Sequence, residues 1–114
     1  MKTALAVLVL VASLAGAALA APRAESAMEC GIAADMAVVA RSLAQEEVKQ
    51  PQAGAIMARI YDVSESVRGK ELMKDIIHAA YRSNGASSQK FAEELFAVCM
   101  KDGGNMDTVL GKRL

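Results

Sequence analysis

Apolar residues recur at helical spacing along most of the chain. In residues 27–48, four large apolar side chains follow one another at steps of four, three and four, which places them on one face of an α-helix. These are Ile32, Met36, Val39 and Leu43. Ser26 and Glu29 fit a capping box at the start of the segment. Alanines cover much of the remaining circumference, so we expect this helix to be central.

Two further helices are expected over residues 52–66 and 69–83. Pro51 suits the first turn of the earlier helix, because its ring presets a helical φ angle and it has no N–H to donate. That helix is marked by Ile56, Ile60, Val63 and Val67. The later helix is expected to turn five residues inward, namely Leu72, Met73, Ile76, Ile77 and Ala80. Asn84-Gly85 stops it, since both residues tolerate the left-handed conformation.

A fourth helix is predicted over residues 88–101, capped by Ser87 or Ser88. It carries two adjacent apolar stripes, formed by Phe91, Leu95 and Val98 and by Ala92, Phe96 and Cys99. No window alternates between apolar and polar residues with β-branched enrichment, so we expect no strands. The pattern predicts an all-α fold: a small four-helix domain over residues 27–102 with short loops. A flexible lead-in (21–26) precedes it and a mobile tail (103–114) follows.

The N-terminal residues 1–20 have the pattern of a secretory signal peptide. Lys2 is followed by an apolar run over residues 4–15, which is shorter than the roughly 20 residues that span a bilayer. Cleavage is expected after Ala20, at a small-x-small site. Cys30 follows Met28-Glu29 rather than ending the apolar run, so it is not a lipid attachment site. We therefore expect a periplasmic or secreted protein with no stable membrane insertion.

Charge and composition narrow the classes of partner. After removal of residues 1–20, the chain has 12 Lys and Arg and 13 Asp and Glu, so its net charge is close to zero. This balance gives no electrostatic reason to expect nucleic acid or an anionic membrane as a partner. The chain has only two Tyr, two Phe and no Trp. The core must then be built from Ala, Met, Ile, Val and Leu, and small cores of this kind usually need covalent or oligomeric support.

The only two cysteines, Cys30 and Cys99, lie in the first and fourth predicted helices. In an oxidising compartment they are expected to form a disulfide that ties the ends of the domain together. The other interpretations have less support. A catalytic thiol needs a neighbouring base, a structural zinc site needs four ligands, and Cys30, Cys99 and His78 make three. A Cys-x-x-Cys motif is absent.

Other candidate chemistry is sparse. His78 shares a helix face with charged residues and is expected to be solvated, while Asp75, three residues earlier, offers at most a weak metal contact. The pairs Glu46-Glu47 and Glu93-Glu94 diverge by about 100° on a helix and do not converge on a substrate. Six methionines after residue 20 are interpreted as core fillers or an adaptable binding surface. No catalytic motif is found, so we expect no catalytic, cofactor or metal site and no enzyme activity.

The layout resembles small secreted helical proteins of proteobacteria that carry one cysteine pair. The resemblance covers residues 28–101 and depends on Cys30 and on the Ser-capped KFAEELFAVCM segment with Cys99. The architecture is also similar to periplasmic acid-stress chaperones of the HdeA type, whose cysteines are less widely spaced and whose function we do not transfer. The sequence thus predicts an exported, non-enzymatic interaction protein that binds a protein partner or itself as a homodimer. The alternative is a periplasmic chaperone or carrier for apolar ligands or unfolded chains.

Overall fold

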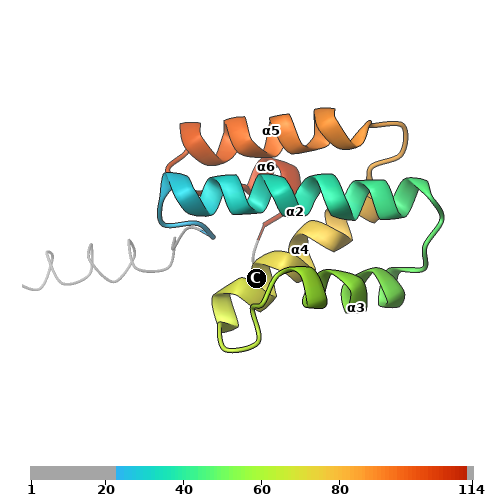
Figure 1. The fold of residues 1–114 in the computed structure, drawn as a ribbon. Helices are drawn as coiled ribbons and strands as arrows, with labels where there is room; N and C mark the ends of the chain where they lie inside the picture. The colour runs from blue at the N-terminus through green and yellow to red at the C-terminus, as the bar shows by residue number, and fades with distance from the viewer. Residues whose placement is uncertain (1–22, 113–114) are drawn as a thin grey trace, which may run out of the picture.

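A computed structural model describes residues 23–112, which form an all-helical fold without strands (Figure 1). Its helices are α2 (Ala27–Gln45), α3 (Gln50–Ile60), α4 (Val67–Arg82), α5 (Ser88–Lys101) and the short α6 (Asp107–Leu110). The prediction of an all-α fold with four main helices is confirmed. The predicted signal peptide, residues 1–20, lies outside the described residues.

Helix α2 lies at the centre of the arrangement. Figure 1 shows α5, α2 and α3 side by side in one layer, with each helix antiparallel to the next one, while α4 passes diagonally behind α2. The central position follows from composition, because Ala33, Ala37 and Ala40 let neighbouring helices approach α2 closely. The layer has one face covered by α4 and α6 and an opposite face that is open.

Three helices begin with a serine cap. The side chain of Ser26 accepts from the N–H of Glu29, that of Ser66 from Gly69, and that of Ser87 from Lys90. Each bond satisfies a backbone donor that the helix itself leaves without an acceptor. The expected caps of α2 and α5 are therefore confirmed. Glu29 does reach back along the chain, but it accepts from the N–H of Glu25 at 3.0 Å instead of from its own cap residue.

Helix α2 ends at Gln45, earlier than the predicted residue 48. Val48 donates to the carbonyl of Leu43 and Glu47 donates to that of Ala44, which is the pairing of a Schellman motif. Glu47 has a φ of 62°, the left-handed conformation that usually calls for glycine. The sequence has no glycine at this turn, and this is why the pattern did not show where the helix stops.

The second predicted helix was placed wrongly at both ends. Helix α3 stops at Ile60, and Val67 opens α4 instead of closing α3. Val63 lies in the intervening loop, partly buried against the core. The face that α3 buries consists of Ala53 and Met57, so the large residues Ile56 and Ile60 that marked this helix are exposed.

The core gathers around α4. The predicted inward residues of this helix are all buried, and Ala79 joins them: Leu72, Met73, Ile76, Ile77, Ala79 and Ala80. From the other helices, Met36, Met57 and Leu95 are among the largest fully buried side chains. Methionine is flexible and fills gaps between helices that cross at an angle, which suits a core with so few aromatic residues.

Both terminal segments of the described chain pack onto the helices, in contrast to the expected flexible lead-in (21–26) and mobile tail (103–114). Arg23 is 6% exposed, and Met106 and Leu110 are buried. The N–H of Ala24 donates to the carbonyl of Gly104 at 3.2 Å, so the two segments lie against each other. The spacing of Met106 and Leu110 is one helical turn, which was too short a pattern to interpret from sequence.

Candidate binding surface

The two cysteines form the predicted disulfide. Cys30 and Cys99 are both buried, with their Cα atoms 5.7 Å apart, and the bond joins α2 to α5 across 69 residues of sequence. Because both sulfurs are used in this bond, neither is available as a thiolate nucleophile or metal ligand while the protein is oxidised.

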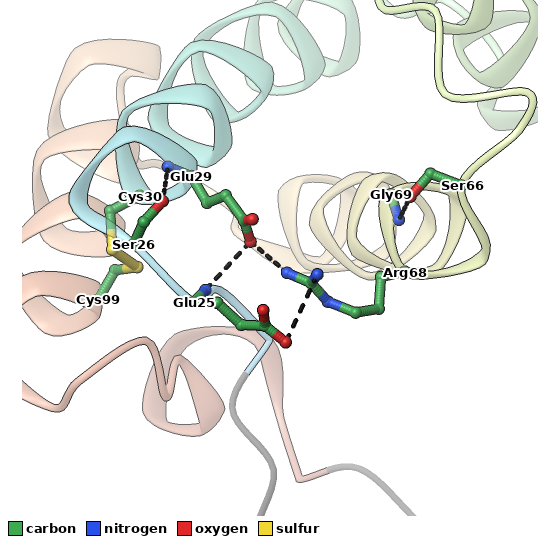
Figure 2. A network of polar contacts seen from close by, with 8 residues as sticks. All are labelled: Glu25, Ser26, Glu29, Cys30, Ser66, Arg68, Gly69 and Cys99. Carbon is green, nitrogen blue, oxygen red and sulfur yellow. Dashed lines mark hydrogen bonds and ion pairs between the residues drawn. A yellow bond between two sulfur atoms is a disulfide. The ribbon is translucent and has the colours of Figure 1, made fainter.

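A cluster of charged side chains lies beside the disulfide at the start of α2. Figure 2 shows Arg68 reaching from the first turn of α4 to Glu25 and Glu29. Glu29 also accepts from the N–H of Glu25, so one carboxylate joins the lead-in, α2 and α4. All three side chains are partly exposed, which limits the energy of the pairs to about 1 kcal/mol or less each. We interpret this network as a connection between two helix starts, not as a site for chemistry.

The other candidates from the sequence are dispersed. His78 is exposed, and its neighbour Asp75 accepts from Arg23 Nε at 3.0 Å. Within residues 23–112, no group of three or more His, Cys, Asp or Glu side chains is placed to hold a metal ion. The glutamates of the two pairs, Glu46-Glu47 and Glu93-Glu94, are exposed.

An apolar groove runs along the open face of the layer, between α2 and α5. Its volume is about 710 Å³, larger than a hollow of about 450 Å³ between α3 and α4 and a charged one of about 410 Å³ beside Arg23. Its floor is formed by the small residues Gly31, Ala34 and Ala92. Val38 and Phe96, 40% and 41% exposed, stand at its sides.

The charged residues that line this groove are both acidic. Asp35 lies on the α2 side and Glu93 on the α5 side, where Glu93 also accepts from Gln89 Nε2 at 3.1 Å. Neither carboxylate takes part in an ion pair within the described residues. The groove therefore offers an apolar floor with negative charge and no intramolecular counter-ion.

Asp35 also faces the end of α3. Burial raises the pKa of Tyr61, the residue after α3, and the nearby charge of Asp35 raises that pKa further. Asp35 thus lies between the groove on one side and α3 on the other. The apolar residues Ile56 and Ile60 of α3 are 39% and 54% exposed, so each of the three helices of the layer carries exposed large apolar side chains.

The sequence did not show where this surface lies, because an apolar stripe on a helix does not reveal whether it is buried in the core or exposed. Phe96 belongs to one of the two apolar stripes of α5; Ala92, in the same stripe, is buried, whereas Phe96 is 41% exposed and lines the groove. The sequence did carry one signal for this surface. A helix packed on one side buries one apolar stripe, whereas α5 has two, so part of one stripe is left exposed. Glu93 was interpreted only as a solvated residue, and its position at the groove depends on tertiary packing.

None of the comparisons with known proteins gives a match: no family model, no curated protein and no solved structure resembles the chain. Among residues 23–112, no helix is both long enough and apolar enough to cross a lipid bilayer.

Proposed function

We propose that the protein is an exported, non-enzymatic interaction protein that binds an amphipathic helical segment in the groove between α2 and α5. The observation that carries the proposal is the combination of an apolar floor, two half-exposed apolar walls and an acidic lining. Helix-in-groove recognition uses an apolar helix face as the anchor, with charges at the edge setting specificity. The negative charges of Asp35 and Glu93 favour an occupant with Lys or Arg beside its apolar face.

Export is the second part of this proposal. The first 20 residues have the pattern of a signal peptide, and a disulfide in a small domain is typical of oxidising compartments. We place the mature protein in the periplasm or outside the cell, with the first residue after Ala20. N-terminal sequencing and intact mass of the chain recovered from the periplasm of a bacterial host test this placement. An uncleaved leader on cytosolic protein with two free thiols would contradict it.

We also propose that the protein has no enzyme activity, because of where the residues that could carry out catalysis lie. Both thiols are in the disulfide, and His78 lies exposed on α4 away from the groove residues. The lining of the groove has two carboxylates and the hydroxyl of Ser88, but no histidine, cysteine or cationic side chain. This arrangement suits recognition of a surface better than a reaction.

Fluorescence anisotropy with two labelled peptides tests the groove. One is an amphipathic helix of Leu and Lys, and the other a matched helix of Leu and Glu, each titrated with the oxidised full chain after its natural export. We expect the Leu/Lys peptide to bind and the Leu/Glu peptide to bind at least about tenfold more weakly.

Two variants and one control locate the binding. Phe96→Ser removes an apolar wall and Glu93→Lys reverses a lining charge, and each is expected to weaken the Leu/Lys peptide by about tenfold. Glu94→Lys makes the same charge change on the neighbouring residue, which does not line the groove. Equal binding of both peptides, or equal effects of Glu93→Lys and Glu94→Lys, would contradict the proposal.

The alternative function, a chaperone or carrier for apolar ligands, has one observation in its favour. The hollow between α3 and α4 is lined by Met73 and Ile77, with Pro51 and Gly54 opposite. A titration with the neutral apolar dye Nile red at neutral and acidic pH distinguishes this function. A chaperone activated by acid would bind more dye as the pH falls, and dye binding that stays flat across the pH range would contradict this function.

A further inference from the structure

The open face of the layer carries both a groove and a ridge of complementary chemistry. The groove between α2 and α5 is apolar with acidic residues, and the exposed flank of α3 is apolar with a basic residue, Arg59, beside Ile56 and Ile60. Building on the function proposed above, we infer that the occupant of the groove is α3 of a second copy of this chain, in a two-fold symmetric dimer.

The ridge and the groove lie on the same face of the molecule. On α3, Met57 is buried, while Pro51 and Gly54 line the hollow against α4. At about 100° per residue, Ile56 and Ile60 then fall on the opposite flank of α3, toward α2 and the open face. Asp35 connects the two features, because it lines the groove and its charge also acts on Tyr61 at the end of α3.

Arg59, Asp35 and Glu93 also lie at about the same level, measured along the axis of α2. The disulfide places Cys99 beside Cys30, and α5 runs antiparallel to α2, so Glu93, six residues before Cys99, lies near the level of Met36. Figure 1 shows the end of α3 beside the middle of α2, and the charge of Asp35 in α2 acts on Tyr61 at that end. Arg59 therefore shares the level of Asp35 and Glu93 to within about one helical turn, roughly 5 Å.

Rotation by 180° about an axis parallel to α2 generates the second copy. The rotation keeps each residue at its level along α2 and exchanges the α3 side of the layer with the α5 side. Such an operation lays α3 of each copy over the groove of the other, as an isologous interface requires. Arg59 of one copy then faces Asp35 and Glu93 of the partner subunit, and the contact occurs twice. Within the described residues Arg59 takes part in no ion pair, so this pairing breaks no existing one.

The dimer also covers four of the eight large apolar side chains that are exposed among the described residues. Val38 of α2, Phe96 of α5 and the two isoleucines of α3 all lie on the three helices of the open face. Helix α4, which lies behind the layer, exposes one large apolar residue, Val67, at its first position. A second copy is favoured over an anionic membrane, because the groove lining is negatively charged.

Sedimentation equilibrium of the oxidised full chain, recovered after its natural export, tests the inference. We expect a dimer with a dissociation constant that rises with salt concentration. The single variants Arg59→Glu and Glu93→Arg each place like charges opposite one another at both contacts, and each is expected to weaken the dimer by at least about 100-fold. Glu94→Arg is the matched control, expected to stay within about threefold of the unmodified chain.

Mixing the two single variants gives the decisive measurement. In a heterodimer of Arg59→Glu with Glu93→Arg, both contacts again pair opposite charges, so two proteins that are monomeric alone should associate when mixed. Native mass spectrometry identifies this heterodimer by its mass. Circular dichroism and thermal unfolding of each variant show that it is folded, and Phe96→Ser, which leaves all charges in place, provides a second means of weakening the dimer.

The outcomes separate this inference from the proposed function. A chain that is monomeric at about 1 mM overturns the dimer, and if it still binds the Leu/Lys peptide the proposed function is supported. A dimer that is insensitive to both charge reversals, or variants that stay monomeric when mixed, also overturns the arrangement. A monomer that binds neither peptide contradicts both proposals.

Discussion

Two arginines, Arg23 and Arg41, are buried, and the sequence pattern gave no indication of their burial. Arg23 donates to Asp75, Asp107 and the carbonyl of Gly111, the last two at 2.8 Å. Arg41, on the buried side of α2, donates to the carbonyls of Ala80 and Ala86. A buried charge is costly unless it is hydrogen-bonded, and each guanidinium is held by bonds to segments far apart in sequence, three from Arg23 and two from Arg41.

We expect Arg23→Ala to lower the free energy of unfolding by about 2–4 kcal/mol. The change removes three charge-assisted hydrogen bonds and leaves Asp75 and Asp107 facing each other without a cation. Urea unfolding followed by circular dichroism measures the loss. Lys90→Ala, on the exposed side of α5, is the control and should change stability by less than about 0.5 kcal/mol. Equal effects of the two substitutions would contradict the structural role of Arg23.

Glu47→Gly is expected to stabilise the protein by about 0.5–1 kcal/mol. The backbone of Glu47 is left-handed, with a φ of 62°, which costs a residue with a Cβ atom about 1–2 kcal/mol. Glycine removes this cost, although its greater freedom in the unfolded chain offsets part of the gain. Glu46→Gly, at a neighbouring position whose φ is −87°, should destabilise the protein instead. A lower melting temperature for Glu47→Gly would count against the observed turn.

At the scale of single helices, small residues decide which side of a helix faces the core. Helix α3 turns Ala53 and Met57 inward and leaves two isoleucines outside. Helix α5 similarly buries Ala92 and exposes Phe96. Close approach of helix backbones requires small side chains at the contact, and this requirement overrides the simple rule that the largest apolar residues are buried.

Two glycines in helices are expected to respond oppositely to alanine. A Cβ atom on Gly54 would meet nothing within 4 Å, so Gly54→Ala should stabilise α3 by about 0.5–1 kcal/mol through helix propensity. A Cβ atom on Gly69 would lie 3.0 Å from both Ser66 Oγ and Val63 Cγ1. Gly69→Ala should therefore destabilise the protein by disturbing the cap of α4 and the packed loop. Thermal unfolding of both variants tests the contrast, and a stabilising Gly69→Ala would refute it.

At the scale of the whole molecule, one covalent bond connects the beginning of the central helix to the end of α5. The closed loop spans 69 residues, and in the chain-entropy model a loop of this length contributes roughly 4 kcal/mol by restricting the unfolded chain. Small domains are stable by only about 5–15 kcal/mol in total. The disulfide thus supplies much of the support that a core of alanine and methionine lacks.

The double variant Cys30→Ser/Cys99→Ser is expected to lose about 3–4 kcal/mol of unfolding free energy. Chemical denaturation of the variant and of the reduced natural chain should give similar values, because both lack the bond and keep side chains of similar size. An unchanged denaturation midpoint would show that the disulfide has no part in stability. The same variant is also expected to be more sensitive to proteolysis at the ends of α2 and α5.

Much of the fold could be read from the sequence because it depends on local periodicity. The bounds of α5 and the inward face of α4 agree with the predictions, since strong amphipathic patterns and serine caps define them. The end of α2, the extent of α3 and the order of the terminal segments were missed. The end of α2 is a local turn at Glu47 that lacks the usual glycine. The terminal segments depend on contacts between distant residues, such as Arg23 with Asp107, for which a single sequence carries no signal.

The sequence by itself determined the helical class, the four main helices and the pairing of the only two cysteines, because spacing, capping and composition act over short distances or leave no alternative partner. The tertiary structure decided which apolar residues stay outside. Phe96 and Val38 became the walls of a groove only when α2 and α5 packed through their alanines, and Asp35 and Glu93 came together there for the same reason. A surface formed by two helices depends on how the helices pack, and that packing is a property of the folded chain.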